Sequence, residues 1–388
     1  MHGGSVVVNA PEDLPVREPT AAASGRPVFG WDVGGAHVKV SMLDACGDVC
    51  DVAQWACALW LGLDQLESTI ALVFARWPRA RDADALHAVT MTGEMVDLFE
   101  DRAHGVDAIA RTLAACLRGR LRFFAGGVGE SGWLDASACG EDWQRVASAN
   151  WLATAQCVAS RLADAVLIDI GSTTTDIVPI EGSCVVARGR SDAARLATGE
   201  LVYHGVVRTP LCGLAHRIAF DGVESNVMNE WFATTADVYR LTGELDPSCD
   251  LYPAADNGPK TPAASRARIA RMIGRDAHEA DDQGWLAFAQ RWRAVQLDGL
   301  AANLASVLAA HERLAHAPLV GAGCGRFLVE ALAHGQGRAY LDFGELVGVP
   351  AHNASWTATC APGVAVALLA ARAAQQVPLG AATQVPFE

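Results

Sequence analysis

The sequence predicts an α/β protein with two related lobes that face each other across a cleft. Short apolar strands alternate with helices along most of the chain, which is typical of α/β architecture and not of a β-sandwich. A strand–turn–strand unit occurs twice, around Asp32 and around Asp169, and two copies of one unit predict two similar lobes. The chain has 388 residues, 51% of them hydrophobic, and can therefore bury a large core.

Composition excludes several classes of protein. A formal net charge of −14 argues against a nucleic-acid surface, which requires a basic footprint. The 11 cysteines form neither a C-x-x-C pair nor a zinc-ligand spacing, and no apolar run reaches the roughly 18 residues that a membrane helix requires. Residues 1–26 are rich in Pro, Ala and Glu and lack a signal-peptide core, so we expect a disordered leader. We therefore expect a cytoplasmic protein that binds neither nucleic acid nor a membrane.

The first copy of the repeated unit covers Val28–Val40, where an apolar strand leads through Gly34 and Gly35 into a second strand. At one constant offset the two copies match Asp32 with Asp169, Gly34 with Gly171, and Lys39 with Asp176. The two copies therefore agree at the aspartate and at the turn glycine, which could contact a ligand. They differ at the third position, where one copy has a lysine and the other an aspartate.

Helix and strand patterns follow in alternation. We expect helices over Leu61–Trp77, Val106–Leu117, Asn150–Arg161, Asp192–Tyr203, Trp285–His311 and Pro362–Ala373, and strands over Ala88–Thr92 and Leu121–Ala125. The proline-rich stretch Asp246–Pro262 shows no periodicity and is expected to be a loop. These elements predict a first lobe over 27–162 and a second over 163–388. The second lobe would carry a helical insertion around 220–315 and a final small-residue helix that returns towards the first lobe and packs against another helix.

The second copy of the repeated unit is the most informative stretch. Apolar β-branched runs flank Gly171-Ser172-Thr173-Thr174-Thr175, which predicts a tight β-hairpin. The turn can present donors to an anion, while Asp169 and Asp176 can bind a metal or accept a proton. A Gly-Ser-Thr loop satisfied by its own backbone is the alternative.

Two later stretches can also meet a ligand. On a helix over Ser265–Arg275, three arginines (Arg268, Arg271 and Arg275) share one face, which is either a solvated face or a site for an anionic substrate. The strand at Leu319 ends in a turn with Gly321, Gly323 and Gly325 that opens a helix, where backbone can approach a phosphate or nucleoside. Such turns also occur for packing.

Several familiar motifs are absent or misleading. The sequence contains no G-x-S-x-G elbow and no Walker A motif, so serine-hydrolase and P-loop functions lack support. His311 and His316 resemble a zinc-protease pair, but five residues separate them by about 140° around a helix, so they cannot share a metal.

Taken together, two Asp-x-Gly hairpins, a Gly-x-Gly turn and a small-residue C-terminal helix resemble the actin-like ATPase superfamily. Within it, the stretch Asp169–Asp176 is similar to the hydantoinase A and oxoprolinase branch. Further stretches resemble the family of tetrahydromethanopterin-linked C1-transfer pathway proteins. They are Thr90–Glu94, Ala149–Ala155, Gly199–Tyr203, Arg208–Pro210 and Phe232–Tyr239.

This resemblance implies a bilobal actin-like, ribonuclease H-like fold and a role in methanofuran or methylofuran biosynthesis. Methanogen members of the family join an aminomethylfuran-methyl diphosphate to γ-glutamyltyramine, forming an aryl ether and releasing diphosphate. For this chain the resemblance implies a phenol as the acceptor and leaves open whether it is of the tyramine or the tyrosine type. We find no sugar-kinase pattern for a catalytic base, which favours diphosphate departure over phosphoryl transfer. An ATP-dependent small-molecule kinase and a hydantoinase- or oxoprolinase-like amidohydrolase are the alternatives.

The resemblance also implies Mg²⁺ or a similar divalent cation, with ATP a less favoured ligand, and small-molecule substrates. Asp32 and Asp169 are the predicted metal ligands, and Asp176 or Glu94 would accept the phenol proton. The predicted diphosphate-binding residues are Gly34, Gly35, Lys39, Gly171, Ser172, Thr173, Thr174, Arg268 and Arg271. The turn with Gly321, Gly323 and Gly325 is the predicted nucleoside-facing turn. The sequence leaves the oligomeric state open, a homo-oligomer included.

Overall fold

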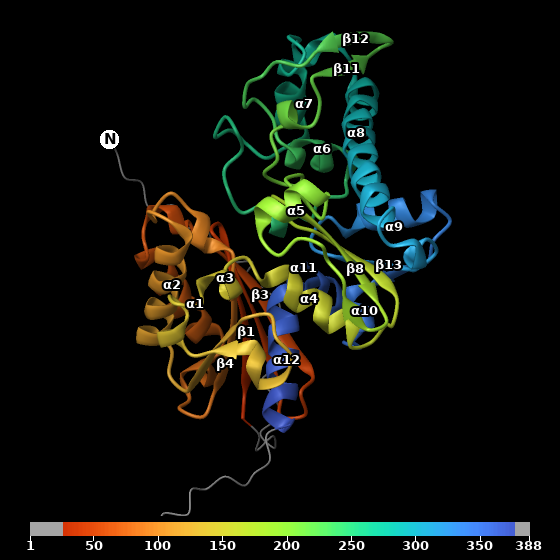
Figure 1. The fold of residues 1–388 in the computed structure, drawn as a ribbon. Coiled ribbons are helices and arrows are strands. Elements are labelled where there is room, and N and C mark those ends of the chain that lie inside the picture. Colours follow the sequence, from red (N-terminus) through yellow and green to blue (C-terminus); the bar gives the residue numbers. More distant parts are fainter. Residues whose placement is uncertain (1–25, 377–388) are drawn as a thin grey trace, which may run out of the picture. The chain divides into compact units, whose positions relative to one another are not determined.

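Residues 26–376 are described by the computed structural model, so the expected leader lies outside the described residues except for Arg26. The described chain divides into two compact units, one formed by 26–157 with 362–376 and the other by 158–361. Figure 1 shows strands and helices in both units. Each unit has a central sheet, and the two sheets carry the two copies of the repeated hairpin.

The first unit contains a six-stranded sheet in the order β3-β2-β1-β4-β5-β6. Its strands are β1 (Val28–Val33), β2 (His37–Leu43), β3 (Val49–Ala56), β4 (Leu86–Met91), β5 (Arg120–Phe124) and β6 (Trp133–Leu134). The β1–β2–β3 meander is antiparallel, whereas β1, β4 and β5 run parallel. The end of β4 therefore comes to lie beside the end of β1.

Helices cover the two faces of this sheet. They are α1 (Asp64–Arg76), α2 (Arg102–Cys116), α3 (Trp143–Val146), α4 (Asn150–Ala159), which runs to the boundary of the unit, and α12 (Ala361–Gln376). Trp31 packs in one apolar cluster with Ile70 of α1 and Ile109 of α2. The next residue back, Gly30, points to the other face, where a Cβ would lie 1.9 Å from the Gly363 carbonyl oxygen of α12. The small-residue helix thus packs closely on a strand of this sheet, and its expected packing against another helix stays a prediction.

The second unit contains a sheet in the order β10-β8-β7-β13-β14, with β9 also paired to β8. Its strands are β7 (Ala165–Ile170), β8 (Thr175–Glu181), β9 (Cys184–Val185), β10 (Leu201–Val202), β13 (Leu319–Ala322) and β14 (Tyr340–Asp342). A separate hairpin consists of β11 (Arg217–Phe220) and β12 (Val223–Asn226). Because β13 runs parallel to β7, with Ala322 opposite Asp169, the turn after β13 begins beside that aspartate.

The helices of this unit are α5 (Asp192–Thr198), α6 (Thr235–Thr242), α7 (Pro262–Arg271), α8 (Asp282–Leu308), α9 (Arg326–Gly335), α10 (Phe343–Leu346) and α11 (Ala351–Thr359). Ile168 and Ile170 of β7 belong to a core that also contains Trp292 and Leu300 of the long helix α8. Strand alternation places Asp169 on the opposite face from these isoleucines.

Some of the expected helix bounds were wrong. The helix expected over Asp192–Tyr203 ends at Thr198, because Gly199 adopts a left-handed conformation (φ 78°) and the chain then enters β10. The helix expected over Ser265–Arg275 begins at Pro262, where the Thr261 hydroxyl accepts the Ala264 N–H, and ends at Arg271. The expected loop before it contains a short 3₁₀ turn, Pro247–Cys249.

The repeat predicted from the sequence is confirmed by strand register. Asp32 pairs with Lys39 across β1 and β2, and Asp169 pairs with Asp176 across β7 and β8. Both turns close with the same backbone hydrogen bond, Gly34 N–H to His37 C=O (2.9 Å) and Gly171 N–H to Thr174 C=O (2.8 Å). The two hairpins are therefore equivalent in backbone structure and differ in their side chains.

Within the described residues, no single helix has the length and apolar composition to cross a membrane, although α11 and α12 meet those criteria when taken as one bent pair.

Candidate functional site

The turn Gly171–Thr174 carries the predicted anion-binding groups of the second unit. The hydroxyls of Ser172 and Thr173 lie 3.4 Å apart at its tip. At its base, Asp169 and Asp176 lie directly opposite each other, so both side chains leave the sheet on one face. Both aspartates are buried. The hairpin thus presents hydroxyls and two carboxylates in one place, as the sequence predicted.

A segment that follows β10 packs directly on this turn. The N–H groups of Val206 and Arg208 donate to the carbonyls of Gly171 (3.1 Å) and Ser172 (2.8 Å). The preceding Gly205 lies so close that a Cβ at this position would be 2.3 Å from the Thr173 nitrogen. The segment from Gly205 to Arg208 is therefore fixed against the turn by its backbone, and only glycine fits at its start.

Asp176 is held by a buried arginine. Arg195 donates from Nη1 to Asp176 Oδ1 (2.7 Å) and from Nη2 to the Glu200 carbonyl (2.9 Å). The Glu200 carboxylate in turn accepts the backbone N–H groups of Arg188 and Gly189 (2.6 and 2.8 Å). Burial raises the pKa of Asp176 above its ordinary value, and the Arg195 guanidinium opposes that shift. This carboxylate therefore has a fixed orientation and a raised affinity for a proton.

The glycine turn after β13 packs against the same hairpin. Gly323 has a φ of 80°, and a Cβ there would lie 2.2 Å from the Ile170 carbonyl oxygen and 2.5 Å from Asp169 Oδ1. The Gly325 N–H donates to the Ile170 carbonyl (2.8 Å), whereas Gly321 lies under the Tyr340 ring. All three glycines are needed for close packing on protein atoms, and their role towards a nucleoside stays a prediction.

Arg208 is a residue of this site that the sequence reasoning missed. Its side chain is exposed, and its guanidinium carbon lies 5.9 Å from the centroid of the Tyr252 ring. The stretch Arg208–Pro210 contributes to the family resemblance, but the sequence by itself predicts no role for it. The sequence signal for Arg208 is that a positively charged residue stands in a family-like stretch shortly after the hairpin.

The equivalent hairpin of the first unit has a charge pair at its base. Lys39 Nζ lies 3.9 Å from Asp32 Oδ2, on strands whose turn contains Gly34 and Gly35. A Cβ on Gly34 would lie 3.4 Å from the Thr92 hydroxyl, because β4 ends beside this turn. The predicted residues of the first copy are thus brought together.

Glu94 follows β4 and is buried in the first unit. It lies in a short 3₁₀ turn, Gly93–Met95, that touches Gly34. The Ser148 hydroxyl donates to Glu94 Oε1 (2.7 Å), and Arg102 Nη2 lies 3.7 Å from the same oxygen. The family-like stretch that ends at Glu94 therefore contacts Ser148, the residue directly before the family-like stretch Ala149–Ala155.

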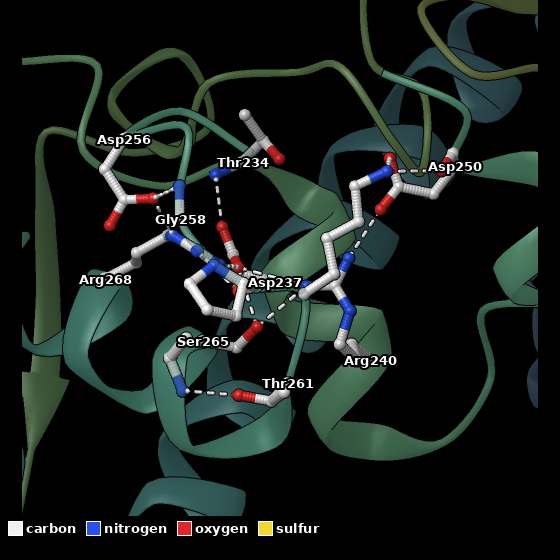
Figure 2. A network of polar contacts seen from close by, with 12 residues as sticks. Thr234, Asp237, Arg240, Asp250, Asp256, Gly258, Thr261, Ser265 and Arg268 are labelled. Carbon is white, nitrogen blue, oxygen red and sulfur yellow. Dashed lines mark hydrogen bonds and ion pairs between the residues drawn. The ribbon is translucent and has the colours of Figure 1, made fainter. Parts of the chain in front are cut away.

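The expectation of an open arginine face on α7 is wrong. Arg268 is fully buried and donates to the carboxylates of Asp237 (2.9 Å) and Asp256 (2.8 Å) and to the Pro259 carbonyl (2.7 Å), and most of this network is drawn in Figure 2. A guanidinium surrounded by protein acceptors cannot bind diphosphate without breaking them. The geometry therefore argues against a ligand role for Arg268.

The other two arginines of the expected face are separated from it. Arg271 is half exposed, with Nη1 3.7 Å from Asp256 Oδ2. Arg275 lies beyond the end of α7 and pairs with Glu279 (3.0 Å). Each thus lies near a carboxylate, which Arg271 shares with Arg268, and a diphosphate role for Arg271 stays a prediction without geometric support.

The predicted metal ligands fit a hydrated Mg²⁺ better than a closed metal site. Among residues 26–376, no group of three or more His, Cys, Asp or Glu side chains is placed to hold an ion. Mg²⁺ usually keeps several waters and takes one or two protein carboxylates together with substrate phosphates. Asp169, next to the hydroxyl-rich turn, meets that need, and so does Asp32 in its own hairpin.

Comparisons with known proteins agree with these features. The family model of hydantoinase/oxoprolinase proteins matches residues 85–373. Over 268 residues the chain is 29% identical to a Methanocaldococcus jannaschii protein, and the match covers 68% of this chain and 76% of that protein. A Methanococcus vannielii protein is 34% identical over 146 residues, which cover 37% of this chain and 64% of the relative. Both are named (4-{4-[2-(gamma-L-glutamylamino)ethyl]phenoxymethyl}furan-2-yl)methanamine synthase.

Among solved structures, a nucleotide-free acetone carboxylase is 11% identical, with a TM-score of 0.53 over 88% of this chain and 70% of that chain. A ROK family glucokinase from Streptomyces griseus is 13% identical and covers 89% of this chain and 99% of that chain, with a TM-score of 0.42. The predicted α/β fold of the actin-like type is confirmed.

Proposed function

The chain belongs to the hydantoinase/oxoprolinase family, and we propose that it is a synthase of methanofuran-type cofactors that forms an aryl ether between a furan and a phenol. The substrates are an aminomethylfuran-methyl diphosphate and the phenol of a glutamyl-tyramine or tyrosine-type acceptor. The printed name of both relatives supports this, because their product contains a phenoxymethyl group on a furan.

In the proposed reaction, the bond between the furfuryl carbon and the diphosphate oxygen breaks, and a bond between that carbon and the phenol oxygen forms. The phenol proton leaves to a base, and diphosphate departs with the bonding electrons. A furfuryl carbon supports positive charge because the ring oxygen donates into it. The main catalytic requirement is therefore to stabilise the negative charge that develops on diphosphate as the bond breaks.

The hairpin of the second unit is suited to that task. The backbone and hydroxyls of Ser172, Thr173 and Thr174 would donate to diphosphate oxygens, whereas Gly171, whose N–H closes the turn, stays a predicted contact without a free donor. Asp169 would hold Mg²⁺, which supplies charge neutralisation on the diphosphate when bound. In the first unit, Gly34, Gly35 and Lys39 stay predicted diphosphate contacts and Asp32 a predicted metal ligand.

Asp176 is the better supported of the two predicted bases. Its fixed orientation and raised pKa suit a carboxylate that takes a phenol proton, since a base works best when its pKa approaches the working pH. Glu94 is bound by Ser148 and Arg102 within the first unit, and its proposed role in proton transfer has no comparable support.

The observation that carries the proposal is the convergence of family-like stretches on the hairpin turn. Backbone hydrogen bonds join Arg208 to Ser172, and β10 pairs Leu201 with Asp176. The residues by which the chain resembles the synthases therefore surround the donors and carboxylates that the reaction requires.

A direct assay tests the proposal. The chain is incubated with the furfuryl diphosphate, Mg²⁺ and either γ-glutamyltyramine or tyrosine, and the products are analysed by mass spectrometry. We expect one ether and one diphosphate per turnover, without ATP. ATP turnover with no ether from either phenol would refute the synthase and favour a kinase or an amidohydrolase of the same family.

A further inference from the structure

We propose that Gln54 and Thr90 are two further ligand-binding residues of the first unit, and that they hold the diphosphate and its hydrated divalent cation beside Lys39 and Asp32. This inference rests on the proposed function, because it extends the predicted diphosphate site by two residues. It starts from two buried polar atoms, Gln54 Nε2 and Thr90 Oγ1, for which residues 26–376 provide no hydrogen-bond partner.

Strand register places four polar side chains in one row across the first sheet. Asp32 of β1 pairs with Lys39 of β2 on one side and with Thr90 of β4 on the other. Lys39 in turn pairs with Gln54 of β3. Residues paired across neighbouring strands project from the same face, so an amide, an ammonium, a carboxylate and a hydroxyl stand side by side. We call these four residues the polar row.

The second copy of the repeat shows that packing does not require polar groups at both ends of such a row. The two sheets have the same strand arrangement at this point. In the second unit, the neighbour of Asp169 on β13 is Ala322. The neighbour of Asp176 on β10 is Leu201. The two outer positions of the row are thus apolar in the second unit and polar in the first.

The two outer residues of the polar row are buried without a partner from the protein. Thr90 has no exposed surface, and no described residue bonds to its hydroxyl. The amide nitrogen of Gln54 is buried in the same way. An apolar side chain at either position would avoid the cost of a buried donor that makes no hydrogen bond. Buried polar groups in native proteins are normally satisfied, so these two call for a partner from outside the chain.

The first turn of α12 adds a favourable charge on the same face of the sheet. Gly30, two residues before Asp32, contacts this helix, and a Cβ on Gly363 would lie 3.7 Å from the Asp32 nitrogen. Further along the helix, Ala373 lines a small hollow with Leu86, the first residue of β4. Figure 1 shows α12 beside β1 and β4. Its N-terminus, which carries a partial positive charge, is therefore directed towards the carboxyl ends of these strands.

The chemistry of the polar row suits a diphosphate that carries a divalent cation. The Lys39 ammonium and the Gln54 amide are donors for phosphate oxygens. Asp32, with Oδ2 3.9 Å from Lys39 Nζ, is the predicted carboxylate ligand of the cation. Thr90 lies beside Asp32 and is suited to bind a water of that cation, because Mg²⁺ keeps several waters when it binds to a protein. The ligand class is therefore a magnesium diphosphate group.

The test measures binding of inorganic diphosphate, with Mg²⁺, to the full chain by calorimetry. Thr90→Val keeps the shape of the side chain and removes the hydroxyl, so we expect a loss of affinity of about fivefold to tenfold. Thr90→Ser keeps the hydroxyl and should retain most of the affinity. Gln54→Leu removes the amide and should also weaken binding by about fivefold.

Thr69→Val is the matched control in the same unit. Thr69 is buried in α1, on the other face of the sheet, and its hydroxyl already donates to the Gln65 carbonyl at 2.8 Å. This variant loses a buried hydroxyl as Thr90→Val does, but it should bind diphosphate like the parent.

The stability of the ligand-free chain gives a second measurement. Because the Thr90 hydroxyl has no protein partner, Thr90→Val should have a Tm equal to or above that of the parent without ligand. Its rise in Tm on addition of Mg²⁺ and diphosphate should be smaller than that of the parent. A lower Tm without ligand, together with parent-like diphosphate affinity, would show that the hydroxyl serves the fold and would overturn the role of Thr90.

Unchanged affinity in folded Thr90→Val or Gln54→Leu chains would overturn the part of the inference that concerns that residue. The binding assay contains neither furan nor phenol, so its outcome is separate from that of the synthase assay. Ether formation by the parent, with unchanged diphosphate affinity in both variants, would refute this inference and leave the proposed function intact. Loss of affinity in both variants without ether formation by the parent would do the reverse.

Discussion

Replacing Arg268 by alanine gives the sharpest test of the buried network. In the folded chain its guanidinium has no exposed surface and donates to Asp237, Asp256 and the Pro259 carbonyl. Asp237 is almost completely buried as well. The substitution removes the cation and leaves a buried carboxylate with less positive charge around it. We therefore expect a loss of stability and no direct effect on ligand binding.

The magnitude follows from the burial of both partners. Removing one member of a buried ion pair typically costs about 3–5 kcal/mol. Arg240 still lies 3.1 Å from Asp237 after the substitution, which favours the lower end, about 3 kcal/mol. For a unit of this size, that loss corresponds to a fall in Tm of about 6–12 °C. Arg271→Ala, on the same helix but half exposed, should cost about 1 kcal/mol or less.

The assay is thermal and urea unfolding of the full chain and both variants, with hydrogen exchange to confirm that protection is lost around α6 and α7. Diphosphate affinity is measured in parallel below the unfolding transition. A stability of Arg268→Ala within about 1 kcal/mol of the parent would refute the structural role. A selective loss of diphosphate affinity at unchanged stability would restore the arginine face that the sequence had suggested.

Three further predictions concern other parts of the chain. Asp176→Asn should lower kcat by more than it weakens diphosphate binding, and equal losses in the two measurements would argue against a role in proton transfer. Burial lowers the pKa of His87 from 6.5 to about 4, so the unfolded chain binds a proton that the folded chain does not. The contribution of His87 to the free energy of unfolding should be fully present above pH 6.5 and should fall by about 3 kcal/mol as the pH drops to 4. Urea unfolding of the His87→Gln variant at several pH values should lack this dependence. Gly205→Ala should lower both the Tm and the synthase rate. The Cβ of the new alanine would overlap the Thr173 backbone, which should cost about 1–3 kcal/mol of stability. A Tm equal to that of the parent would contradict this prediction.

The local elements could be predicted from the sequence because their signals are contained within a few residues. Strand alternation and turn residues predicted both hairpins, and the constant offset between Asp32 and Asp169 predicted a repeat that strand register confirms. The hydroxyl-rich turn and its paired acids are likewise properties of one contiguous stretch. What the sequence determined by itself is therefore the repeated α/β framework and the type of group presented at each turn.

The environment of each charged side chain was decided only by tertiary structure. Periodicity places Arg268 on a helix face but cannot indicate that Asp237, 31 residues earlier, lies buried beside it. Arg208 gains its place at the site through contacts with Ser172 and Tyr252, which are distant in the sequence. Whether an arginine faces solvent, a carboxylate or a turn depends on which segments pack together. That packing minimises buried unpaired charge over the whole unit, and the periodicity of the local sequence does not indicate which distant charges will be paired.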